Sequence, residues 1–218
     1  GIGTNRTGIE AQVNGKYPVP TTAPVSKADA YPYTCVTRTQ AQNLASNVNS
    51  GTKTSSLMFG VQWDLVLAFM HNKGNIADST LTSNSTTIGN YMYSTFQLGQ
   101  TGQYAVYSNY SLSSTWKPST TSTTNFVDSS RNKIAQSSNG NGILVTTGTS
   151  EKNKVMNIYD IAGNVGEWTL EKNSSTGFPC ARRGGWFHLE GSYTPAAYRD
   201  NDNTDDSNGT IGFRVSLF

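Results

Sequence analysis

Two stretches of the chain carry the 3.6-residue apolar spacing of amphipathic helices. Over residues 37–47, apolar residues recur at i, i+3 and i+4, and Thr37 stands where an N-cap would be. Over residues 60–72 a longer apolar stripe is followed by Gly74, a typical stop signal. We predict a helix over each stretch. The stripe of the second helix consists of Val61, Leu65, Val66, Phe69 and Met70.

The remainder of the chain is rich in short apolar runs separated by Gly, Asn, Ser and Thr. Such runs predict short strands joined by turns and long loops. Two early helices followed by a strand-rich and loop-rich remainder indicate an α+β fold. The predicted strands cover residues 33–36, 143–146, 155–159, 167–170, 181–187 and 212–217.

Residues 1–30 contain three prolines among Thr, Ala, Val and Gly, which is typical of a linker or extended arm. We therefore predict an N-terminal arm over 1–30 and a single ligand-binding domain over 31–218. The chain opens on Gly1 without Met, which fits an excised or processed piece of a longer protein.

Composition narrows the function classes. The 218 residues include only 14% charged residues, and the net charge is +2. Without a basic run, there is no electrostatic footprint for nucleic acid. The longest apolar stretch, residues 57–70, is too short and too polar to span a membrane. Two His and two Cys, without paired ligand spacing, argue against zinc. We expect Cys35 and Cys180 to be buried thiols, although one bridge between them stays open.

The last third of the chain holds three ordered motifs: NIYDIAGNVGEWT at 157–169, RRGGW at 182–186 and IGFR at 211–214. Together they resemble the formylglycine-generating enzyme (sulfatase-modifying factor) family, a branch of the C-type lectin fold. The resemblance covers roughly residues 33–218 and is strong in 155–218. It implies a C-type-lectin-like fold. We expect the glycines of RRGGW to allow close backbone packing, Arg183 and Arg214 to satisfy buried acceptors, and Trp168 and Trp186 to lie in the core.

The chemistry of that family is missing from this sequence. Where the family carries its two catalytic cysteines, counted from the RRGGW motif, this chain has Leu189 and Thr194. The family's oxidation needs a thiol pair, because soft thiolate ligands hold monovalent copper. His188 alone offers a base without a nucleophile or an orienting partner. We therefore expect a chain that is not an enzyme and has no catalytic cofactor.

The resemblance also implies a structural calcium site in the 157–169 motif. By position, its ligands would be the side chains of Asp160 and Glu167 and the carbonyls of Gly163 and Val165. Carboxylates and turn carbonyls together are the oxygen donors that calcium prefers. The alternative is that Asp160 caps a turn and Glu167 pairs with an arginine such as Arg183 or Arg214.

The segment between RRGGW and IGFR mixes aromatic and apolar residues with a run of Asn, Asp, Thr and Ser. In the resembled fold this stretch forms an exposed face at one end of the domain. Residues 200–208, like those at 187–189, are all Asn or are reachable from an Asn codon by changing its adenines. This pattern resembles the variable proteins of diversity-generating retroelements; the alternative is a plain polar loop. The expected ligand-binding residues are Phe187, His188, Leu189, Tyr193, Tyr198, Asp200, Asp202 and Thr204.

These observations predict a non-catalytic binder of a protein or glycan receptor on a cell surface, carried by a phage tail or a bacterial cell surface. We expect no nucleic-acid partner and no membrane insertion. The oligomeric state stays open, and avidity would favour a trimer or other multimer. Two alternatives belong to other classes: a divergent oxidase of the formylglycine-generating type, and a structural decoration domain of a phage or cell surface.

Overall fold

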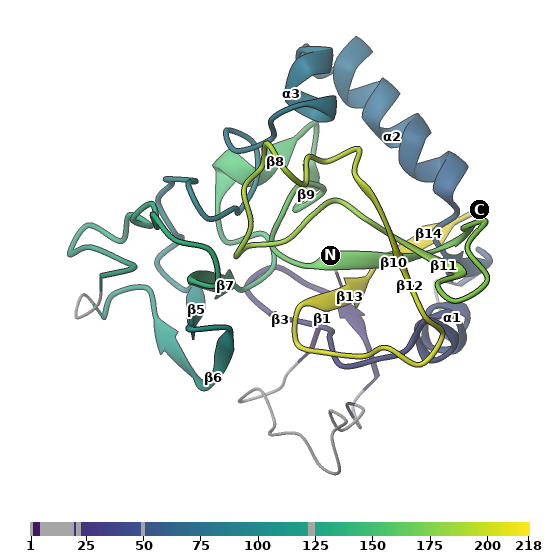
Figure 1. Cartoon of the computed structure of the whole chain (residues 1–218), viewed down its shortest axis with the longest axis horizontal. Coiled ribbons are helices and arrows are strands. Elements are labelled where there is room, and N and C mark those ends of the chain that lie inside the picture. The colour runs from purple at the N-terminus through teal and green to yellow at the C-terminus, as the bar shows by residue number, and fades with distance from the viewer. Residues whose placement is uncertain (1, 5–19, 21–22, 49–50, 122–124) are drawn as a thin grey trace.

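A computed structural model describes residues 2–4, 20, 23–48, 51–121 and 125–218 of the chain. Its helices are α1 (Arg38–Ser46), α2 (Gly60–Asn72) and α3 (Asp78–Thr82), with one 3-10 turn at Glu151–Asn153. Figure 1 shows α2 and α3 along the top of the molecule and α1 at the lower right. Among the described residues no helix combines the length and the apolar character needed to cross a bilayer.

Within the described residues, fourteen strands form five small sheets. The central sheet has the order β12-β11-β10-β13, and only its β10–β13 pair is parallel. A second sheet, β6-β5-β7, forms the lobe at the lower left of Figure 1. Three smaller sheets have the orders β2-β1-β3, β14-β4 and β8-β9. The strands are β1 (Ile2–Thr4), β2 (Val25–Ser26), β3 (Tyr31–Pro32), β4 (Ser55–Leu57), β5 (Gln103–Ser108), β6 (Ser111–Pro118), β7 (Gly142–Val145), β8 (Lys154–Val155), β9 (Ile158–Tyr159), β10 (Gly166–Lys172), β11 (Cys180–Arg183), β12 (Arg199–Asp202), β13 (Ile211–Phe213) and β14 (Val215–Leu217).

The predicted α+β class and both predicted helices are confirmed. Thr37 caps α1 through a capping box, because its side chain accepts from the Gln40 amide while the Gln40 side chain accepts from the Thr37 amide. The predicted bounds 60–72 of the second helix agree with α2. The short helix α3 was not predicted, and it lies in the tract that we expected to be strands and loops.

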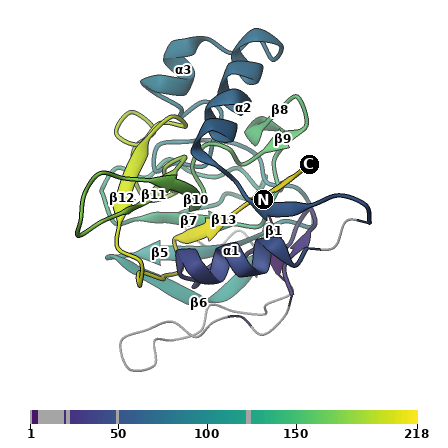
Figure 2. The same cartoon turned by 90° about the vertical axis from the view of Figure 1, so that its right-hand side faces the viewer.

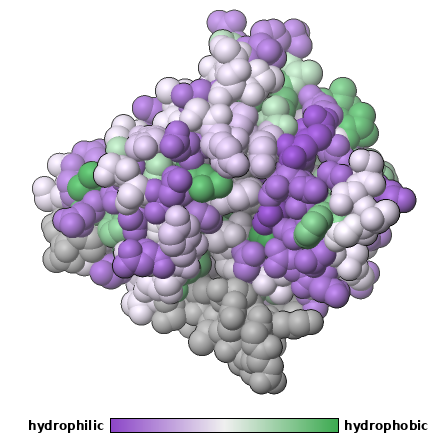
Figure 3. All heavy atoms as spheres, viewed as in Figure 1, coloured by the Kyte–Doolittle hydropathy of each residue, from purple (hydrophilic) through white to green (hydrophobic). Residues whose placement is uncertain are grey.

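The inward face of α2 differs from the predicted stripe. Trp63, Leu67 and Met70 are buried, whereas Val61 and Leu65 point to solvent. As a result, hydrophobic residues gather on the surface at the upper right of the molecule, over α2 (Figure 3). The helix is apolar on every side, so its sequence does not indicate which side faces the core.

Several strand predictions fail where the backbone takes a left-handed conformation. The predicted strand 33–36 is irregular, since Cys35 has a φ of 64°. The predicted strand 155–159 is instead the hairpin β8–β9, whose two turn residues, at 156 and 157, both have positive φ. Two further strands are shorter than predicted: β11 ends before Gly184, and the predicted strand 212–217 is divided at Arg214 into β13 and β14.

The described parts of the predicted N-terminal arm lie against the domain. Strand β1 pairs with both β2 and β3, and Thr147 exchanges backbone hydrogen bonds with Asp29 and Ala30. Residues 1, 5–19 and 21–22 of the arm lie outside the described residues. The division at residue 30 stays a prediction.

The core is divided into adjoining clusters around buried tryptophans. Trp168 of β10 packs against α1 and donates its indole N–H to the carbonyl of Val36 at 2.9 Å. Trp63 of α2 donates to the carbonyl of Ala196 at 3.0 Å. This second bond ties α2 to the segment that leads into β12, where the predicted binding residues lie.

Candidate functional site

The segment at 187–197 is held in place by its backbone. The amide of Met92 donates to the carbonyl of Leu189, the amide of Ser85 donates to the carbonyl of Gly191, and the amide of Ala197 donates to the carbonyl of Leu81. These bonds join the segment to the chain that follows α2. Figure 2 shows β12 and the loop leading into it on the side of the molecule away from the C-terminus. Side chains on this segment are therefore presented by a fixed backbone.

A cavity of about 390 Å³ opens on this segment. Leu189, Glu190, Ser192 and Tyr193 line it, and Asn139 joins them from the loop before β7. The lining combines an aromatic ring and an aliphatic side chain with amide, hydroxyl and carboxylate groups. Such a combination suits a ligand that buries an apolar surface and forms a few directional hydrogen bonds.

Aromatic rings continue from this cavity toward β12. Tyr193 is 68% exposed, and its ring centroid lies 6.4 Å from that of Tyr198. Tyr198 in turn meets Trp186 edge-on at 6.4 Å, and the Arg182 guanidinium lies 4.9 Å from the Trp186 ring. We predicted Trp186 to be a core residue, but it is only half-buried and forms part of this surface. We call Asn139, Leu189, Glu190, Ser192, Tyr193 and Tyr198 the tyrosine face.

Two of the eight predicted ligand-binding residues are wrong because they are buried. Phe187 is fully buried and packs edge-on against Tyr107 at 5.4 Å. Asp202 is the inward-facing residue of β12 and forms an ion pair with Arg182 at 3.0 Å. Neither side chain can reach a ligand in this structure. Their neighbours Leu189 and Thr204 are half-buried and exposed, respectively.

His188 is a half-buried framework residue. Its ring stacks on Tyr107 at 4.5 Å, and its Nε2 accepts a hydrogen bond from the indole N–H of Trp186 at 3.1 Å. Burial and the nearby positive charge of Arg182 lower the pKa of His188 to about 4. The imidazole is therefore neutral at pH 7, and the nitrogen that could act as a base is already occupied.

Both aspartates of β12 form ion pairs with Arg182. Asp200 is half-buried and also pairs with Arg182, so the guanidinium lies between two carboxylates. Burial and a hydrogen bond that protonated Asp202 can donate to the Asp206 carboxylate raise the pKa of Asp202 to about 6. Because Asp200 and Asp202 are both engaged by Arg182, the polar contacts of this strand are mainly internal.

In the 157–169 motif, Glu167, one of the expected calcium ligands, is paired with an arginine side chain. Arg214 forms a two-pronged ion pair with Glu167, with Nη2 at 2.6 Å from Oε1, and also donates to the carbonyl of Asp160 at 3.0 Å. Asp160 Oδ2 accepts from the amide of Gly148 at 2.8 Å, and burial raises the pKa of this carboxyl. The described residues include no group of three or more His, Cys, Asp or Glu that could hold a metal.

Of the four predicted calcium ligands, Glu167 already has Arg214 as its partner, whereas Asp160 Oδ1 is buried with no hydrogen-bond partner among the described residues; the calcium site stays a prediction that a calcium titration decides. Glu167 is buried and spends both carboxylate oxygens on Arg214. At Gly163 the backbone approaches Asn90 closely, since a Cβ atom at Gly163 would lie 2.1 Å from the Asn90 carbonyl oxygen. The pairing of Glu167 with an arginine, which we kept as the alternative, is confirmed with Arg214 as the partner.

Arg183 of the RRGGW motif also neutralises carboxylates inside the fold. Arg183 is buried and pairs with Asp64 of α2 at 2.5 Å and with Glu171 of β10 at 3.0 Å. Arg199 joins the same two carboxylates from the solvent side. The expected close packing at the following glycines is also present, since a Cβ at Gly185 would lie 2.1 Å from the Thr194 carbonyl oxygen.

At the two positions where the resembled family carries its catalytic cysteines, this chain has a half-buried Leu189 and a buried Thr194. Thr194 is fully buried, and its hydroxyl donates to the carbonyl of Glu190 at 3.3 Å. Leu189 presents an aliphatic side chain to the cavity. Cys35 and Cys180 are both buried thiols, as predicted. Burial raises the pKa of the Cys180 thiol, which disfavours the thiolate that metal binding or nucleophilic attack requires.

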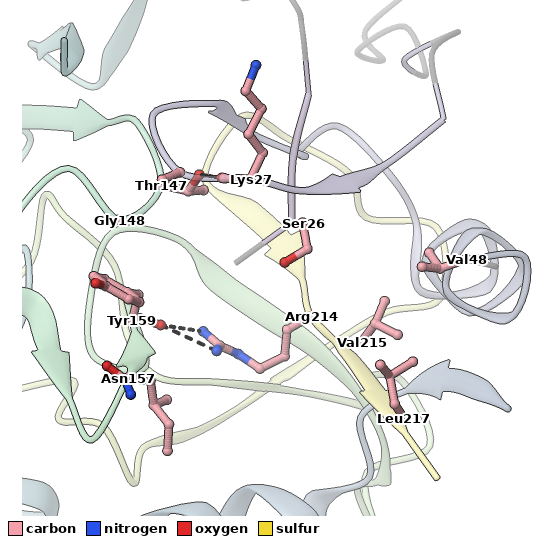
Figure 4. A pocket seen from close by; sticks show the side chains of 12 residues that line it. Ser26, Lys27, Val48, Thr147, Gly148, Asn157, Tyr159, Arg214, Val215 and Leu217 are labelled. Atoms are coloured by element: carbon pink, nitrogen blue, oxygen red, sulfur yellow. Dashed lines mark hydrogen bonds between the residues drawn. The ribbon is translucent and has the colours of Figure 1, made fainter. Parts of the chain in front are cut away.

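A second cavity, of about 520 Å³, was not predicted from the sequence. It lies between the residues that follow β2, the β9 hairpin and β14 (Figure 4). Arg214 extends across it toward the carbonyl of Tyr159, and Val215 and Leu217 form an apolar side. The described residues that line it include no carboxylate and no thiol.

The sequence as a whole matches a known family. Residues 10–217 match the Sulfatase-modifying factor enzyme 1-like domain. The chain belongs to this family. The match confirms the predicted relationship and with it the C-type-lectin-like α+β fold, and it begins within the stretch that we predicted to be an arm.

Comparison with individual proteins adds one similar structure. It is Treponema denticola variable protein 1, which is 17% identical, with a TM-score of 0.38. The match covers 75% of this chain and 47% of that one, so this chain spans less than half of the length of its structural relative. No curated protein matches the sequence.

Proposed function

We propose that this member of the family is a non-catalytic ligand-binding protein and that the tyrosine face is its binding surface. The observation that carries the proposal is the contrast between the exposed Tyr193, beside an open cavity, and the hydrogen-bonded backbone that supports it. Tyrosine gives a large contact area with little loss of side-chain entropy. A preformed surface lowers the cost of binding further.

The absence of a thiol pair at positions 189 and 194 supports a binding role over oxidation. Leu189 cannot coordinate copper, and the hydroxyl of Thr194 is buried and already bonded. An oxidase reaction through this cavity would need ligands that its lining residues do not offer. The residues that line the cavity suit contact with a ligand rather than electron transfer.

The partner that we propose is a protein or glycan receptor on a cell surface, with this chain displayed on a phage tail or a bacterial cell. The cavity lining of one aromatic, one aliphatic and three polar side chains is compatible with either receptor type. The low net charge of +2 gives no electrostatic attraction to nucleic acid. The specific receptor has to be found by screening.

The binding proposal is tested with a labelled preparation of the chain on a glycan array and on intact bacterial cells. Tyr193→Ala, alone and combined with Leu189→Ala, should lower the affinity for any bound target at least about tenfold. Tyr110→Ala is the matched control, because Tyr110 is equally exposed, at 70%, but lies in the β5–β6 turn. Equal losses in both tyrosine variants, or binding that neither changes, would refute the site.

We also propose that the C-terminal segment, which carries Leu189, Tyr193 and Tyr198 of the tyrosine face, is diversified. The supporting observation is that residues 187–189 and 200–208 are all Asn or reachable from an Asn codon, whereas Glu190 is not reachable and would be constant. Sequencing the DNA downstream of the gene tests it. A near-copy of the region encoding Gly184–Phe218 that differs almost only at adenines, beside a reverse transcriptase, is the expected result. Without such a copy, the face has a fixed specificity.

A further inference from the structure

Helix α2 presents a second apolar surface, separate from the tyrosine face. Its inward side is formed by Trp63, Leu67 and Met70. On its outward side Val61 is 66% exposed, Leu65 is 64% exposed and Phe69 is 43% exposed. Phe59, directly before the helix, is 41% exposed. We call these four exposed residues the outer stripe.

The outer stripe carries no formal charge. The single charged residue within α2 is Asp64, and its carboxylate is engaged by Arg183 and Arg199. Ala68 is exposed next to Leu65, so the helix backbone can be approached closely there. A surface helix that faced only water would carry charged or polar residues on this side. The outer stripe therefore has the composition of a helix that is covered on both sides.

The area of the outer stripe matches the apolar centre of a stable interface. If a full large apolar side chain presents on the order of 200 Å², the exposed fractions leave roughly 400 Å² of apolar surface. A standard interface removes about 800 Å² from each partner, and somewhat more than half of that is apolar. One partner of matching character is enough to cover the stripe.

The spacing of the stripe favours a second copy of the same chain as that partner. Val61, Leu65 and Phe69 lie four residues apart, which forms one ridge of the i±4 type on the helix surface. The ridge is symmetric about its middle residue. When two such helices cross antiparallel, Leu65 meets Leu65 of the second copy, and Val61 meets Phe69. A two-fold interface requires this reciprocity.

The geometry points to a two-fold dimer in which the α2 helices of two chains pack through their outer stripes, with Leu65 at the axis. The antiparallel arrangement also places the amino end of each helix beside the carboxyl end of its partner, where the helix dipoles attract. Because the tyrosine face is built on other segments, this dimer does not depend on the proposed binding function. It narrows the open oligomeric state to two copies.

The dimer is tested by measuring the mass of the full chain in solution with light scattering or sedimentation equilibrium. The wild type should have a two-chain mass. Leu65→Glu and Leu65→Lys should each weaken association at least about 100-fold and run as one chain. Phe178→Glu is the matched control, since Phe178 is 50% exposed on the loop between β10 and β11, and it should stay dimeric.

Mixing the two Leu65 variants provides the decisive step. If residue 65 of one copy faces residue 65 of the other, the glutamate and lysine chains attract and the equimolar mixture regains a two-chain mass. Thermal unfolding should show that both variants are folded, because the substituted side chain is mostly exposed. A one-chain mass for the wild type at every concentration would overturn the dimer. A two-chain mass that Leu65→Glu leaves unchanged, or a mixture that stays monomeric, would overturn it as well.

Discussion

The buried ion pair between Glu167 and Arg214 should be strongly sensitive to the loss of one partner. The Arg214 side chain is 13% exposed and that of Glu167 is 3% exposed. Arg214→Met would leave the Glu167 carboxylate buried without its partner and would remove the donor to the Asp160 carbonyl. Breaking a buried pair from one side costs about 3–5 kcal/mol. Since a typical domain is stable by about 5–15 kcal/mol, the variant should keep its fold with much of its stability lost.

Arg199→Met is the matched control for this experiment. Arg199 also contacts two carboxylates, Asp64 and Glu171, but its side chain is 47% exposed. Both carboxylates keep Arg183 as a partner after the substitution. An exposed pair contributes about 0–1 kcal/mol, so Arg199→Met should change the free energy of unfolding by no more than that. The two variants remove the same chemical group and differ in burial.

Urea unfolding followed by tryptophan fluorescence measures the change in the free energy of unfolding for both variants, and thermal unfolding measures the change in Tm. In a chain of this length, each kcal/mol corresponds to about 2–4 °C in Tm, so Arg214→Met should melt about 6–20 °C below the wild type. Adding Glu167→Gln to Arg214→Met removes the stranded charge, and the double variant should regain about 2 kcal/mol. The argument fails if Arg214→Met costs no more than Arg199→Met, or if Glu167→Gln makes the double variant still less stable.

Four further predictions concern the titration of Asp202, the titration of His188, a buried lysine and calcium. The pKa of Asp202 is raised to about 6, so wild-type stability falls as the pH rises from 4 to 6; Asp202→Asn should gain about 2 kcal/mol over the wild type at pH 7 and little at pH 4. The pKa of His188 is lowered to about 4, so wild-type stability is lost as the pH falls from 6.5 to 4. The stability difference between His188→Gln and the wild type should shift by about 3 kcal/mol over that range. Urea unfolding at several pH values checks both, and differences independent of pH would contradict them. Lys133 is buried and donates to the carbonyls of Tyr91, Met92 and Ser94. Lys133→Met should cost about 3 kcal/mol or more in urea unfolding, whereas Lys154→Met, whose ion pair is exposed, should leave the unfolding curve almost unchanged. Calorimetric titration of the chelator-treated chain with calcium should give no heat, because Arg214 neutralises Glu167. A one-to-one isotherm would contradict this expectation and would support the predicted calcium site.

Features with a local cause were predictable from the sequence. Thr37 and Gln40 form a capping box within four residues, and Gly74 follows the last turn of α2, so the positions of both helices could be read directly. The glycine pair at 184–185 also acts locally, because the backbone there needs positive φ and close approach. The three ordered motifs of the last third then identified the family.

Features that depend on contacts between distant segments were not predictable in the same way. Glu167 and Arg214 are 47 residues apart, and the sequence left Arg183 as an equal alternative. The exposure of Leu65 and the burial of Phe187 depend on which neighbours cover them, and both stretches are apolar on more than one side. The hairpin at 156–157 was missed because Met156, a non-glycine residue, takes a left-handed conformation there.

Burial also limits how far the proposed diversified segment can vary. Phe187 is reachable from an Asn codon, yet its ring is fully buried against Tyr107. Replacing a buried Phe with a small residue costs about 3–5 kcal/mol, and an Asn there would also bury an unpaired amide. Tyr193 and Thr204 are exposed, so substitution there leaves the core intact. Functional copies of the segment should therefore keep a large apolar residue at 187 while positions 193 and 204 vary freely. Frequent polar residues at position 187 in folded copies would contradict this and would show that the core around Tyr107 rearranges when residue 187 changes.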